Sequence, residues 1–66
     1  MMNLIEGIQQ QCNRVREILP HYEEIGPAGA FGLMMLKRDI AEGEAAIASG
    51  DVVRMMRAYE ALKGCE

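Results

Sequence analysis

The sequence has few of the residues that give a small protein a dense core or a covalent scaffold. Among its 66 residues are no tryptophan, one phenylalanine, two tyrosines, two cysteines and two prolines. A chain of this length buries only about 60% of the surface that its unfolded form exposes. Small domains usually compensate with disulfides, a metal or a partner chain. Two cysteines are too few for a disulfide-rich secreted scaffold.

The two cysteines, Cys12 and Cys65, lie far apart and match no metal-binding or redox spacing. We therefore expect reduced thiols and a cytoplasmic protein, with Cys12 buried in the core and Cys65 accessible in the tail. No run of 18 apolar residues is present, so the sequence predicts no membrane span. It also predicts no cofactor.

Positive charge is scarce as well. Seven basic residues stand against ten acidic ones, for a net charge of −3. Proteins that grip nucleic acid do so chiefly by neutralising phosphates, so this balance argues against nucleic acid as the main partner. One local alternative remains, in which a helix-turn-helix places Arg54 and Arg57 of the last helix in the major groove.

What the sequence does have is helical periodicity, most clearly between Asn3 and Ile25. Apolar side chains recur there at alternating spacings of three and four residues: Ile5, Ile8, Cys12, Val15, Leu19 and Tyr22. This heptad pattern predicts a helix over about 3–25 with Asn3 as its N-cap. Pro20 lies inside the pattern, so we expect the helix to kink there or to end and restart.

Two short glycine-containing segments divide the rest of the chain. Gly26-Pro27 is typical of a helix end followed by a helix start, and Ser49-Gly50-Asp51 of a second such boundary. They predict helices over about 27–49 and 51–63, joined as a helical hairpin with an added helix. Gly29 and Gly32 fall on or beside the apolar stripe of the second helix. We expect close helix packing there, and anion binding at a helix N-terminus is the alternative.

These elements predict one all-α domain over residues 1–66. A short third helix cannot cover the apolar faces of two long ones, and large exposed apolar patches are rare on soluble monomers. The sequence therefore favours a homodimeric bundle. Its predicted interface is the heptad series of the first helix: Ile5, Ile8, Cys12, Val15, Leu19 and Tyr22. The alternative is that this series packs inside one chain, against the other two helices.

Residues that could carry chemistry are sparse. Glu17, His21 and Glu24 could share one helix face and form a conceivable divalent-metal site, but an exposed charged face is the favoured interpretation. No nucleophile elbow, Cys–His pair or clustered carboxylates are apparent, so the sequence predicts neither a metal site nor an enzyme. The favoured function is a protein–protein interaction module. The alternative is a small DNA-binding regulator that uses Arg54 and Arg57.

Two motifs carry a resemblance to known proteins. Residues 26–32 read GPAGAFG and residues 49–53 read SGDVV. With these motifs the chain resembles small, uncharacterised helical proteins encoded by bacteriophages and prophages, over about residues 22–62. The resemblance implies a bacterial or phage cytoplasmic protein with an accessory role, and it transfers no catalytic residue.

Overall fold

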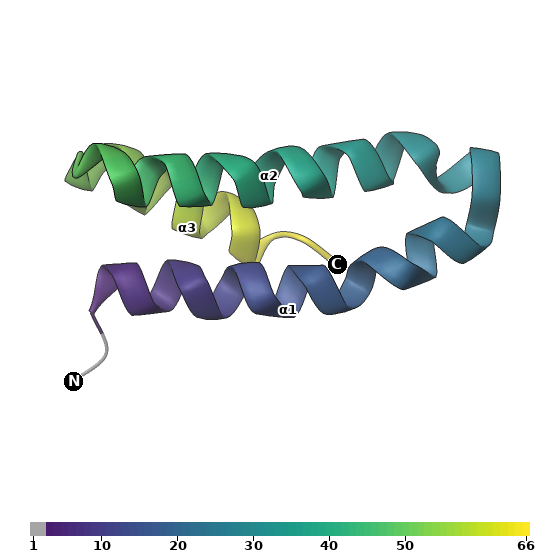
Figure 1. The fold of residues 1–66 in the computed structure, drawn as a ribbon, viewed down its shortest axis with the longest axis horizontal. Coiled ribbons are helices and arrows are strands. Elements are labelled where there is room, and N and C mark those ends of the chain that lie inside the picture. Colours follow the sequence, from purple (N-terminus) through teal and green to yellow (C-terminus); the bar gives the residue numbers. More distant parts are fainter. Residues whose placement is uncertain (1–2) are drawn as a thin grey trace.

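Three α-helices make up the fold of residues 3–66, the part of the chain that the computed structural model describes. They are α1 (Leu4–Ile25), α2 (Ala30–Ser49) and α3 (Val52–Lys63), and a 3-10 turn, η1 (Gly26–Gly29), joins the first two. Helices α1 and α2 form an antiparallel hairpin, and α3 packs against both (Figure 1). The predicted all-α class is confirmed.

The helix ends follow from local sequence. The Asn3 side chain accepts a hydrogen bond from the backbone N–H of Glu6 at 2.8 Å, which caps α1. Gly50 has a φ of +71°, the left-handed conformation that closes a helix with least strain in glycine. Asp51 then caps α3 by accepting from the N–H groups of Val53 and Arg54 at 3.0 and 3.2 Å. The caps expected from the sequence are present.

One boundary prediction needs correction, and of the two alternatives expected at Pro20 the break is absent. The second helix begins at Ala30 rather than at residue 27, because residues 26–29 form the tighter 3-10 turn. Gly26 and Gly29 are poor α-helix formers, and short 3-10 segments are common at helix ends. Helix α1 neither ends nor restarts at Pro20, which lies inside it. Pro20 is exposed, and the last turns of α1 bend toward α2 in Figure 1.

The core lies where all three helices meet. Its fully buried side chains include Ile8 and Val15 of α1 and Leu62 of α3, all at 0% exposure. Gly43 of α2 lies at the centre. A Cβ placed on Gly43 would stand 3.0 Å from Leu62 Cδ1 and 3.2 Å from both Cys12 Sγ and Ile8 Cγ2. The absence of a side chain at this position therefore lets α1 and α3 approach α2 closely.

The helices differ in length, with 22, 20 and 12 residues. Helix α3 runs beside the first half of α1, where Arg14 Nη2 donates to the carbonyl of Leu62 at 2.7 Å and so satisfies the end of α3. The C-terminal tail continues along α1, since the Tyr22 hydroxyl donates to the carbonyl of Glu66. The far part of the hairpin lies beyond the end of α3.

The two glycines singled out from the sequence lie at close approaches near this far end. A Cβ on Gly32 would stand 2.5 Å from Cε2 of the Tyr22 ring, and one on Gly29 would stand 2.5 Å from the Tyr22 carbonyl oxygen. Both positions therefore pack tightly against Tyr22 of α1.

Candidate interaction surface

The interface predicted on the first helix is wrong for this fold. Ile8, Cys12 and Val15 are at most 2% exposed within the single chain, where they form the core with α2 and α3. Leu19 and Tyr22 are half-buried against the same core, and only Ile5, at 42%, is exposed. A surface already covered inside the chain cannot also contact a second copy. The heptad series of α1 is used within one chain.

The prediction for the second cysteine is also wrong. Cys65 is only 7% exposed, although it lies two residues beyond the end of α3. Its thiol lies 3.4 Å from a carboxylate oxygen of Asp39 and 3.5 Å from the carbonyl oxygen of Ala61, and its one proton can be donated to either. The tail therefore folds back onto the hairpin. Cys12 is buried, as predicted, and both thiols are free.

Both thiols should react slowly in the folded protein. Burial raises the pKa of Cys12 and Cys65 above the ordinary value of 9.0, and the Asp39 carboxylate raises that of Cys65 further. Thiolate is the reactive form, so we expect a thiol reagent to label neither site quickly at neutral pH and both in urea. Mass spectrometry of the modified chain counts the labels. Rapid labelling of either site in the folded protein would contradict its burial.

The same shifts predict how stability depends on pH. The unfolded thiols ionise near pH 9, and the folded ones at higher pH because their pKa is raised. The thiol contribution to the free energy of unfolding is therefore fully present below pH 9 and is lost as the pH rises through the folded pKa values. Urea unfolding at pH 8 and pH 10 measures this loss.

An exposed apolar face remains on α2, on the side away from α1 and α3. Phe31 is 70% exposed and Met34 is 58% exposed, and both are large apolar side chains of α2. They begin a row of exposed residues at spacings of three, four, three, four and three: Phe31, Met34, Arg38, Ala41, Ala45 and Ala48. We call this row the outer seam. Such spacing places all six side chains along one line of the helix.

Sequence reasoning considered only the buried stripe of α2 and missed the outer seam. The heptad spacing that could have revealed the seam occurs twice on this helix, once on each face. The second occurrence is hard to recognise because three of its six residues are alanine and one is arginine. A helix that is apolar on both faces is typically covered on both.

Charged side chains border the outer seam. Lys37 and Glu44 lie along one edge, and Glu42 lies along the other. Glu44 also forms an ion pair with Arg16 of α1, and Glu42 forms one with Arg54 of α3. Arg38, inside the seam, makes a 3.9 Å contact with Asp39, and its side chain is 67% exposed. The seam is therefore an apolar strip with one charge inside it and ion-pairing groups at its edges.

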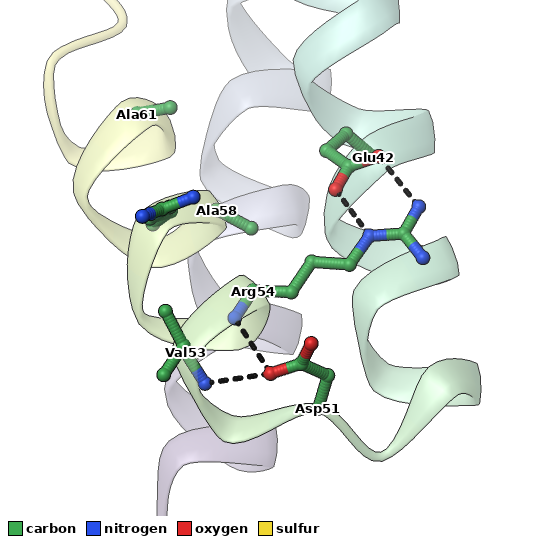
Figure 2. A pocket seen from close by; sticks show the side chains of 7 residues that line it. Glu42, Asp51, Val53, Arg54, Ala58 and Ala61 are labelled. Carbon is green, nitrogen blue, oxygen red and sulfur yellow. Dashed lines mark hydrogen bonds and ion pairs between the residues drawn. The ribbon is translucent and has the colours of Figure 1, made fainter.

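A second surface feature is a groove of about 370 Å³ between α2 and α3. Figure 2 shows Arg54 reaching from α3 to Glu42 of α2, while Asp51 holds the start of α3. The Arg54–Glu42 pair is bidentate, with N···O distances of 2.6 and 2.9 Å. Hydrogen bonding to Arg54 lowers the pKa of Glu42, and the same contact raises that of Arg54.

Both arginines of the DNA-binding alternative line this groove. Arg54 forms an ion pair with the Glu42 carboxylate, and Asp51 lies in the same groove as Arg57. Val52, Val53 and Met56, each at least 56% exposed, cover much of the outer side of the first turns of α3. This face of α3 is thus mixed in charge and partly apolar.

No protein-family model, curated protein or solved structure matches the chain. The geometry of the chain itself is therefore the basis for its candidate function.

Metal sites and membrane-spanning helices are absent from the part of the chain that the structure describes. Over residues 3–66 no three His, Cys, Asp or Glu side chains are placed to hold a metal ion, and Glu17, His21 and Glu24 form no such group. Nor, in that part of the chain, is any helix long and apolar enough to cross a membrane. The outer seam, with Phe31 and Met34 exposed, remains as a candidate interaction surface.

Proposed function

We propose that the protein is a non-enzymatic protein–protein interaction module that binds through the outer seam of α2. The observation that carries the proposal is the exposure of Phe31 and Met34 at the head of a seam with heptad spacing. Aromatic and methionine side chains are enriched at protein interfaces, where a few residues supply most of the binding energy. A surface of this kind contacts a partner rather than reacting with a substrate.

The proposal includes a homodimer and a bacterial or phage setting. The small size of the chain and its exposed apolar side chains support association with a second copy, now through α2 rather than α1. The resemblance of residues 22–62 to phage and prophage proteins supports the setting. Two free cysteines support a reducing, cytoplasmic location.

Affinity capture with matched variants tests the proposal. The unaltered chain and a Phe31→Glu variant are immobilised and exposed to a lysate of the native cell, and bound proteins are identified by mass spectrometry. Gln10→Glu, which adds the same charge on the exposed side of α1, is the control. We expect the Phe31→Glu variant to capture at least about tenfold less partner protein than the unaltered chain or the control.

If the Phe31→Glu variant retains the proteins that the unaltered chain binds, the proposal is contradicted. Circular dichroism of the variants verifies that each keeps its helices, because Phe31 is exposed and its replacement leaves the core intact.

The alternative proposal is DNA binding through α3, with Arg54 and Arg57 at the bases or phosphates. The Arg54–Glu42 pair opposes it, because Arg54 would have to leave a bidentate partner to contact DNA. A gel-shift assay at low salt decides. Sequence-selective binding that weakens on Arg54→Ala and on Arg57→Ala would favour DNA over protein as the partner.

A further inference from the structure

We infer that the occupant of the outer seam is a second copy of this chain, whose α2 lies antiparallel to the first across a twofold axis. The inference rests on the proposed function and names its partner. Three features of the seam carry it: the order of its large and small residues, the charges at one edge, and the position of Arg38.

The order of residues along the seam is complementary to its own reverse. Large side chains occupy the first half, and alanines occupy the second half. When two copies run antiparallel in the register centred between residues 39 and 40, each large side chain meets an alanine. The layers are Phe31 with the partner's Ala48, Met34 with the partner's Ala45, and Arg38 with the partner's Ala41. Alternation of large and small residues is what lets two helix surfaces interdigitate.

A parallel pairing lacks this complementarity. It would place Phe31 against the partner's Phe31 and Ala45 against the partner's Ala45, so the helices would be held apart at one end and drawn together at the other. It would also place the two Arg38 side chains in the same layer. The antiparallel order avoids both problems over a seam about 26 Å long, the length of 17 helical steps.

The charges at one edge of the seam match in the same register. Residues that flank the seam on the same side face each other in an antiparallel helix pair. Lys37 then lies opposite the partner's Glu44, within about 3 Å along the helix axis, and symmetry repeats the pair. Glu44 already accepts from Arg16 of its own chain, and a carboxylate has acceptor sites for both donors. Two ion pairs of this kind would form in each dimer.

Arg38 supplies the third feature, because it lies next to the twofold axis. Its side chain is 67% exposed, and within residues 3–66 its ion contact is the 3.9 Å approach to Asp39. Beside the partner's Ala41 its stem has room to lie along the seam while the guanidinium reaches water. A charged residue at one seam position weakens an association but fixes its register.

The test exchanges the two edge charges between two variants. Lys37→Glu places two like-charge pairs in its own dimer, and Glu44→Lys does the same with the opposite sign. An equimolar mixture restores two opposite-charge pairs in the mixed dimer. We expect each variant alone to associate about tenfold more weakly than the unaltered chain, and the mixture to recover most of that loss. Sedimentation equilibrium at low salt measures all three, and Lys63→Glu, away from the seam, controls for net charge.

The outcomes separate this inference from the function on which it rests. Weakened variants whose mixture gains nothing would overturn the antiparallel register. An unaltered chain that stays monomeric would overturn self-association. The interaction function would still stand in that case, without its homodimer, if Phe31→Glu lost a different captured protein, and it would fail if nothing were lost. Circular dichroism of each variant is expected to show unchanged helix content, since Lys37 and Glu44 are exposed.

Discussion

Ile8→Glu is expected to unfold the protein. Ile8 is 0% exposed and contacts the centre of the core, so the substitution places a carboxylate where no charged partner or water is available. Burial of an unpaired charge costs about 4 kcal/mol or more. A chain of this size has a total stability of roughly 3–10 kcal/mol, at about 0.05–0.15 kcal/mol per residue. Circular dichroism should therefore show little helix at 25 °C.

The control for this experiment is Ile8→Val, which removes one methylene and should cost about 1 kcal/mol. Acid should partly restore the helix signal of Ile8→Glu, because a protonated carboxyl is less costly to bury. A variant that stays folded and merely loses a partner would place Ile8 in an intermolecular contact, as the sequence first suggested. That result would overturn the core described for α1.

Gly43→Leu is expected to cost about 3 kcal/mol, which is close to the upper end for overpacking. The three nearest side-chain atoms to the new Cβ would lie 3.0–3.2 Å away, on Leu62, Cys12 and Ile8. All three side chains are at most 2% exposed, so none has free space to move into. Thermal unfolding should show a melting temperature lower by at least about 10 °C.

The matched control is Glu17→Leu, which adds a leucine on the exposed side of α1. We expect it to leave the melting temperature within a few degrees, since surface substitutions usually change stability by about 0.5 kcal/mol or less. If Gly43→Leu instead raised the melting temperature, helix propensity would outweigh packing at this position. Gly43 would then lie on an open face of α2.

Local signals in the sequence were sufficient to predict the helices. Asn3, Gly26, Gly50 and Asp51 each act on the backbone within a few residues, so their effect does not depend on the rest of the fold. The start of α2 was the exception. There the close approach of Gly29 to the Tyr22 carbonyl accompanies a tighter turn, and that approach is a tertiary contact.

The candidate site was harder to predict, because periodicity tells which face of a helix is buried and not what buries it. The heptad series around Ile8 and Val15 was recognised, but its partner was assigned to a second chain instead of to α2 and α3. Cys65 was misplaced for a related reason. The contacts that hold the tail, such as that of the Cys65 thiol with Asp39, join residues 26 positions apart. No local pattern encodes them.

The two long helices differ in how their apolar faces are used. Helix α1 uses its apolar stripe to build the core of its own chain. Helix α2 contributes Leu36, Ile40 and Gly43 to that core and carries a second apolar seam on its other face. Under the proposed function, Phe31 and Met34 are exposed because they form a surface for contact with a partner.

Sedimentation equilibrium of the unaltered chain over micromolar concentrations tests this account most directly. We predict a mass that rises with concentration toward twice the monomer value of 7.3 kDa, and a Phe31→Glu variant that stays at 7.3 kDa throughout. A mass of 7.3 kDa for the unaltered chain at every concentration would contradict pairing through the outer seam, as would a Phe31→Glu variant that associates as strongly as the unaltered chain.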